Sequence, residues 1–80
     1  MFYVYILYSE EKDIYYKGFT SDLEKRLEQH NANKSFYTSS KGHWKLVYSK
    51  SFEIKTEALI EEKRLKKLNR ASLERLILNK

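Results

Sequence analysis

The sequence predicts an α+β fold in which a small three-stranded, mostly antiparallel sheet is flanked by helices in the order β-β-α-β-α-α. Three observations lead to this prediction. Two runs rich in β-forming residues stand five residues apart, as the strands of a hairpin do. A capped helical segment and a third β-rich run follow them, and two segments with helical spacing come after these. Because 80 residues suffice for one domain only, residues 1–80 are expected to form a single unit.

Three strands are expected from the distribution of β-forming residues. Residues 2–8 form a continuous apolar and aromatic run, which is typical of a central strand. Residues 9–13 are polar and turn-like, and residues 14–19 resume β character, so together they predict a hairpin. After a polar, loop-like stretch at 33–42, residues 44–52 predict the third strand.

Tyrosines gather on the expected hairpin. Alternation along a strand places Tyr3 and Tyr5 on one face of the first strand, whereas the neighbours Tyr15 and Tyr16 point to opposite faces of the second. Cross-strand aromatic pairing is a sufficient structural reason for most of them. A buried tyrosine hydroxyl nevertheless needs a hydrogen-bond partner or a chemical role.

The first helix has a clear predicted start. Residues 21–24 (Ser-Asp-Leu-Glu) fit a capping box, in which the serine hydroxyl and the glutamate carboxylate satisfy the first free amides of a helix. Leu23 and Leu27 mark one face of this helix, which is expected to end near Asn31.

Two further helices are expected towards the C-terminus. Residues 56–68 and 71–78 have helical spacing of apolar residues, with a break near Asn69. In the loop before the third strand, Phe36 and Tyr37 are expected to act as apolar anchors.

Composition limits the classes of function. The chain has no cysteine, which excludes disulfides, thiolate zinc sites and a cysteine nucleophile. With only two histidines, a metal bound here should be a hard ion such as Mg²⁺ or Mn²⁺ on oxygen ligands. Sixteen basic against eleven acidic residues give a net charge of +5, which favours contact with nucleic acid. No apolar run approaches the ~20 residues of a membrane span and no signal peptide is evident, so a cytoplasmic protein without membrane contact is expected.

Two polar residues share the apolar face of the first helix. Arg26 and His30 are one turn apart and lie on the same side as Leu23 and Leu27. The arginine either lays its aliphatic stem over apolar surface or points its guanidinium into a shared cleft. The sequence leaves both alternatives open.

A carboxylate interrupts the expected apolar stripe of the second helix, which runs through Ala58, Leu59 and Leu65. Glu62 lies one turn after Ala58 and three residues before Leu65. A carboxylate there costs several kcal/mol unless it is paired or binds a cation. Glu61 lies near the other edge of the stripe, so periodicity does not choose between the two glutamates. A salt bridge to a nearby lysine is the alternative to a functional role.

The residues of interest also stand in a recognisable order. The tripeptides at 3–5 (Tyr-Val-Tyr) and 16–18 (Tyr-Lys-Gly) lie on the two strands of the expected hairpin. Tyr16 follows Tyr5 by eleven positions and precedes Arg26 by ten. In these features, and in the stretch YKGFTSDLEKRLEQHN, the chain resembles the GIY-YIG nuclease family. The similarity is to its small stand-alone bacterial members and to the N-terminal nuclease domain of the excision-repair incision subunit.

The resemblance continues through residues 37–38, 44–48 and 62–66, and so covers essentially the whole chain. There are departures from the family pattern. The first tripeptide keeps only its final tyrosine, and Lys17 stands where isoleucine is usual. Asn69 follows Glu62 too closely to be matched with the asparagine of the larger nucleases.

The resemblance implies the GIY-YIG endonuclease fold and a set of site residues. Glu62 would be the sole protein ligand of Mg²⁺ or Mn²⁺, and Arg26 would hold the phosphate oxygens. Tyr5 or Tyr16 would orient or deprotonate the attacking water, with His30 and Lys17 as helpers. The implied catalytic residues are Tyr5, Tyr16, Arg26, His30 and Glu62.

Basic residues of the C-terminal half, together with Lys17, are candidates for phosphate contact. These are Lys17, Lys63, Lys66, Lys67 and Arg70, with Arg75 nearby. The favoured hypothesis is a divalent-metal-dependent endonuclease that hydrolyses phosphodiester bonds in DNA rather than RNA, selects structure rather than sequence, and acts in DNA repair or processing. A nucleic-acid-binding module of the same fold with little or no activity is the alternative. A protein-interaction domain with an incidentally basic surface is the third hypothesis.

Overall fold

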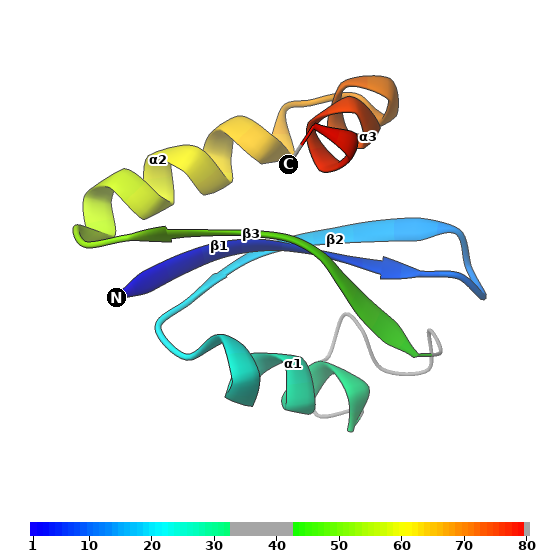
Figure 1. Ribbon diagram of the computed structural model, residues 1–80, viewed down its shortest axis with the longest axis horizontal. Coiled ribbons are helices and arrows are strands. Elements are labelled where there is room, and N and C mark those ends of the chain that lie inside the picture. The colour runs from blue at the N-terminus through cyan, green and yellow to red at the C-terminus, as the bar shows by residue number, and fades with distance from the viewer. Residues whose placement is uncertain (33–42, 80) are drawn as a thin grey trace.

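The computed structural model describes residues 1–32 and 43–79 and shows the predicted order β-β-α-β-α-α (Figure 1). The elements are β1 (Phe2–Ser9), β2 (Ile14–Thr20), α1 (Leu23–Asn31), β3 (Trp44–Phe52), α2 (Lys55–Lys66) and α3 (Arg70–Leu78). The third strand has the predicted bounds, and each other element differs from its prediction by at most two residues at an end. The predicted anchors Phe36 and Tyr37 lie outside the described residues.

The three strands form one antiparallel sheet in the order β2-β1-β3, with β1 at the centre. Tyr5 pairs with Gly18 on β2 and with Ser49 on β3, and an irregularity between Ile6 and Leu7 shifts the register of β1 against β3. Helix α1 covers one face of the sheet, and α2 and α3 cover the other (Figure 1). The continuous apolar run of β1 reflects this position, because a central strand between two layers of helices is buried on both faces.

Alternation along β1 divides the core between the two faces of the sheet. Val4 and Ile6 pack with residues of α2 and α3, among them Leu65. Tyr5 and Leu7 form a second cluster with Trp44, against which Tyr16 and the two leucines of α1 pack. On β2, Tyr15 belongs to the first cluster and Tyr16 to the second, as predicted.

The start of α1 differs from the predicted capping box. Asp22, rather than Ser21, is the N-cap, and its carboxylate accepts a hydrogen bond from the Lys25 amide at 3.1 Å. The third helical position is therefore Lys25 and not Glu24, so no glutamate is placed to close a capping box. The prediction was wrong by one residue because serine and aspartate both cap helices well, and sequence alone does not choose between neighbours.

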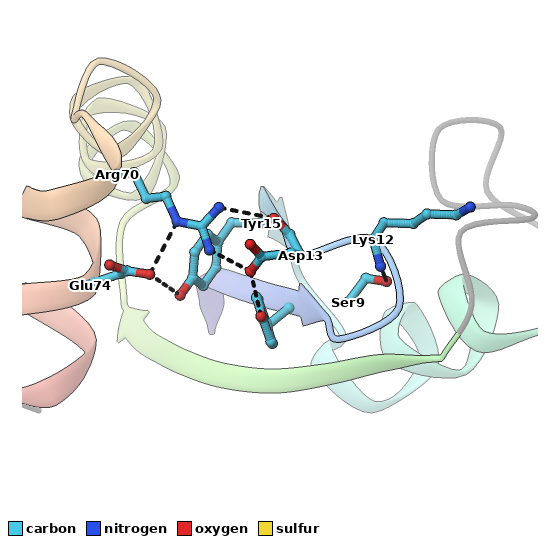
Figure 2. A network of polar contacts seen from close by, with 7 residues as sticks. Ser9, Lys12, Asp13, Tyr15, Arg70 and Glu74 are labelled. Atoms are coloured by element: carbon cyan, nitrogen blue, oxygen red, sulfur yellow. Dashed lines mark hydrogen bonds and ion pairs between the residues drawn. The ribbon is translucent and has the colours of Figure 1, made fainter.

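Helix α3 is joined to the turn of the β1–β2 hairpin by a polar network (Figure 2). The Arg70 guanidinium donates to the Asp13 carbonyl at 2.9 Å, to the Asp13 carboxylate, and to the Glu74 carboxylate at 3.2 Å. Tyr15 also donates to Glu74, and Tyr8 donates to Asp13 at 2.6 Å. Asp13 has φ of 54°, a conformation that aspartate tolerates in tight turns. The network therefore fixes the hairpin turn against the C-terminal helix.

Across the described residues, no helix is both long enough and apolar enough to cross a membrane.

Candidate active site

The Tyr5 hydroxyl is the centre of a group of polar side chains on the α1 face of the sheet. It accepts a hydrogen bond from Arg26 Nε at 3.4 Å and lies 3.0 Å from His30 Nε2. Tyr5 is 1% exposed and His30 is fully buried. Because the arginine can only donate, the hydroxyl accepts from Arg26 and is able to donate its own hydrogen to a neutral His30.

Tyr16 completes the group from the neighbouring strand. Its ring centroid is 4.9 Å from that of His30 and 6.2 Å from that of Tyr5. Hydrogen bonds raise the pKa of Arg26, that with Tyr5 most strongly and that with Tyr16 to a smaller degree. Four of the five residues expected to be catalytic therefore meet in one place.

The position of Arg26 decides between the two alternatives left open by the sequence. Its side chain is half-buried, and its Nη1 donates to Gln29 at 3.4 Å while its Nε donates to Tyr5. The guanidinium thus points into the shared site. Helical spacing is the reason, since the face that carries Leu23 and Leu27 against the sheet also carries Arg26 and His30.

Burial sets the protonation of the two innermost groups. Burial raises the pKa of Tyr5 to about 12; the hydrogen bond and charge of Arg26 oppose this, and the nearby Tyr16 and Glu62 add to it. Burial, reinforced by the positive charge of Arg26, lowers the pKa of His30 to about 4. Near neutral pH, Tyr5 is therefore a neutral phenol and His30 a neutral imidazole.

Gly18, the last residue of the Tyr-Lys-Gly tripeptide, also lies at this site. A Cβ at this position would lie 2.5 Å from the Tyr5 hydroxyl oxygen and 3.0 Å from a ring carbon of Tyr16. The phenol of Tyr5 thus crosses from the central strand over the backbone of β2. An isolated glycine within a strand is a known signal of such close approach, and it could have identified this position.

The two glutamates of α2 have different surroundings. Glu61 accepts two hydrogen bonds from the Arg64 guanidinium, at 2.7 and 2.8 Å. Its negative charge helps to raise the pKa of Tyr48 on β3. The Glu62 side chain is 20% exposed and forms an ion pair with Lys66 at 3.4 Å. Its negative charge adds to the raised pKa of Tyr5. Of the two carboxylates, that of Glu62 is the one whose charge contributes to the raised pKa of Tyr5, and its contribution is the smallest of those acting on Tyr5.

A family model described as the GIY-YIG catalytic domain matches residues 1–76. The chain belongs to the GIY-YIG family. Its curated relatives include a UPF0213 protein of Oceanobacillus iheyensis, 41% identical over 94% of this chain and 87% of the relative. A UPF0213 protein of Clostridium perfringens is 43% identical over 100% of this chain and 86% of that protein.

The solution NMR structure of a UPF0213 protein from Bacillus halodurans is similar to this GIY-YIG domain. The TM-score is 0.66 at 35% identity, and the match covers 100% of this chain and 86% of that one. The fold assigned from the sequence is therefore confirmed, as is membership of a nuclease family.

The donor groups of this GIY-YIG domain fit a hard divalent cation held mainly by water. Among residues 1–32 and 43–79, no group of three histidine, aspartate or glutamate side chains could enclose a metal ion. Glu62 offers a carboxylate whose ion pair with Lys66 is long and partly exposed, whereas the carboxylate of Glu61 is fully engaged by Arg64. A single carboxylate suits Mg²⁺, which keeps most of its hydration shell in proteins.

The basic residues of this GIY-YIG domain have two kinds of surroundings. Lys63, Lys66 and Lys67 are exposed on and just after α2. Lys17 lies on the α3 side of the sheet, where it lines a surface depression with Tyr15 and Arg70, and so faces away from Tyr16. The guanidinium of Arg70 is held by Asp13 and Glu74. A phosphate would have to compete with these carboxylates for Arg70.

Proposed function

We propose that this GIY-YIG domain is a divalent-metal-dependent endonuclease that hydrolyses phosphodiester bonds in DNA, with selectivity for structure rather than sequence, in DNA repair or processing. The observation that carries the proposal is the convergence of Arg26, His30 and Tyr16 on the buried hydroxyl of Tyr5, with the charge of Glu62 in range. A guanidinium from α1, phenols from β1 and β2 and a carboxylate from α2 offer phosphate donors, polar contacts for water and a metal ligand, which suit phosphodiester hydrolysis.

In this proposal, Glu62 would hold Mg²⁺ or Mn²⁺, and the ion would supply Lewis-acid polarisation of the phosphate and charge stabilisation for the leaving 3′-oxygen. Arg26 donates to the phosphate oxygens through guanidinium hydrogens that Tyr5 does not use, and so binds the charge of the transition state. The basic residues at the end of α2 contact the phosphates of the backbone on either side.

The two tyrosines take different roles. Tyr5 is buried and its pKa is about 12, so it does not act as a general base near neutral pH. It orients Arg26 and is itself held by neutral His30. Tyr16 is half-buried, and we assign to it the contact with the attacking water.

The test compares neighbouring glutamates on the same helix. Purified protein is incubated with branched, nicked and single-stranded DNA in the presence of Mg²⁺ or Mn²⁺. Glu62→Gln keeps the shape of the side chain but removes its charge, and is expected to abolish cleavage. Glu61→Gln is the matched control and should cut DNA at a rate close to that of the unaltered protein, because Glu61 is paired with Arg64. Equal cleavage by the two variants would show that Glu62 is not the metal ligand.

The second candidate function is nucleic-acid binding without useful catalysis. The ion pair of Glu62 with Lys66 favours it, since a carboxylate neutralised by an internal lysine is a weaker metal ligand. Salt-sensitive binding to DNA, or to RNA of the same form, with no cleavage over the panel of metals and substrates would select this candidate.

A further inference from the structure

The side chain of Asn31 joins the end of α1 to the start of β3. Its Oδ1 accepts a hydrogen bond from the Trp44 amide at 2.7 Å, and its Nδ2 donates to the Trp44 carbonyl at 3.1 Å. In a hydrogen-bonded pair of an antiparallel sheet, two residues exchange both of these bonds. The Asn31 amide therefore acts as a substitute for a strand residue at the edge of the sheet.

A carboxamide can satisfy both backbone groups at once. The Trp44 amide needs an acceptor and its carbonyl needs a donor, and a carboxamide presents one of each. The assignment of oxygen and nitrogen in Asn31 follows from this pairing. Asn31 is the last residue of α1, next to the C-cap Ala32.

Residues on both sides of this clamp belong to or contact the candidate active site. On the helix side, the neighbour of Asn31 is the fully buried His30, which contacts the Tyr5 hydroxyl. On the strand side, the Trp44 ring is 1% exposed and lies edge-on to Tyr16 with centroids 6.3 Å apart. The clamp thus fixes the helix that carries His30 relative to the strands that carry the two tyrosines.

We propose that Asn31 is a positioning residue of the active site, an inference that rests on the proposed nuclease function. Both polar atoms of its side chain bond the Trp44 backbone, so it would act through the groups it positions. It sets the distance between α1 and the sheet, and with it the meeting of His30 and Arg26 with the Tyr5 hydroxyl. A small displacement of such groups costs up to about 100-fold in rate, because reacting groups must meet in a narrow range of geometries.

The test combines NMR with kinetics on Asn31→Ala, with Asn69→Ala as matched control. The Asn69 side chain also bonds a backbone amide, that of Ser72 at 2.8 Å, but does so on α3, on the other face of the sheet. Asn31→Ala is expected to speed hydrogen exchange of the Trp44 amide and to move the pKa of His30 up from about 4. It should also lower kcat about 10- to 100-fold with little change in KM. Asn69→Ala should show none of these three effects.

A second variant keeps the test decisive if Asn31→Ala does not fold. Asn31→Asp still accepts from the Trp44 amide but cannot donate to the carbonyl, so it should protect the amide and yet shift the pKa of His30. The proposal would be overturned by an unchanged His30 pKa in both variants, or in Asn31→Asp alone if Asn31→Ala does not fold. Absence of cleavage by the unaltered protein would overturn the nuclease function instead, while the NMR measurements would still decide the role of Asn31.

Discussion

The His30 imidazole is buried beside the Arg26 guanidinium, and this arrangement links stability to pH. The folded pKa is about 4 and the ordinary value is 6.5, so between these values the unfolded chain binds the extra proton. Stability from this group is therefore fully present above about pH 6.5 and is lost as the pH falls towards 4. We expect the free energy of unfolding to decrease by on the order of 2–3 kcal/mol over this interval.

Urea denaturation of the protein and of His30→Gln at a series of pH values measures this effect. The variant cannot take up the proton, so its stability should vary less over the same interval. Parallel curves for the two proteins would contradict a buried neutral histidine.

The missing side chain of Gly18 leaves space for the Tyr5 phenol, so Gly18→Ala should disturb the site directly. The added methyl meets the hydroxyl and Cζ of a buried, hydrogen-bonded ring, which cannot move without weakening its contacts with Arg26 and His30. We expect a loss of about 1–3 kcal/mol in the free energy of unfolding, together with reduced cleavage.

A double-mutant cycle identifies the cause of this loss. In a Tyr5→Leu background the phenol is absent, and Gly18→Ala should destabilise the protein less than it does alone. Equal losses in the two backgrounds would mean that backbone effects, and not the contact with Tyr5, make glycine necessary.

At the scale of elements, the Arg70 network is what ties the β1–β2 turn to α3 (Figure 2). Arg70 is 48% exposed, so solvent and salt screen its ion pairs. Arg70→Met should lower the melting temperature, and the difference from the unaltered protein should shrink as NaCl is added.

Arg75→Met is the control for this prediction, since it removes the same charge from the same helix, and no ion pair of Arg75 is formed within the described part of the chain. If Arg70→Met lowers the melting temperature equally at all NaCl concentrations, the cause is the packing of the guanidinium over the Tyr15 ring, 5.3 Å away, and not the ion pairs.

At the scale of the whole molecule, the net charge of +5 favours association with nucleic acid. If Lys63 contacts a phosphate, Lys63→Ala should weaken DNA binding and reduce the slope of log Kd against log salt concentration by about 0.9. Fluorescence anisotropy with labelled duplex DNA at several NaCl concentrations gives this slope. Lys12→Ala, which removes an equal charge from the hairpin turn, should leave the slope unchanged; equal effects would point to net charge alone.

The order and bounds of the elements could be predicted because they depend on local pattern. A buried central strand, a hairpin with a polar turn and the apolar spacing of α1 and α3 each leave a periodic trace in the sequence. The pattern of α2 is weaker, because Leu59 of its predicted stripe is 39% exposed. The predicted N-cap of α1 was wrong by one residue. Ser21 and Asp22 are both good caps, and the geometry of the preceding turn decides which of them caps the helix.

By itself, the sequence determined the fold, the family and the set of polar residues to examine. Only the tertiary structure decided which of them meet: that Arg26 points into the site, and that the charge of Glu62 rather than Glu61 contributes to the pKa of Tyr5. It also showed the bond between Asn31 and Trp44, which the sequence did not indicate. The physical reason is that periodicity reports which face of an element is buried, whereas these contacts join residues far apart in the sequence: Asn31 and Trp44 are 13 positions apart, and Tyr5 and Arg26 are 21 positions apart. Their geometry depends on how the two faces of the sheet are packed.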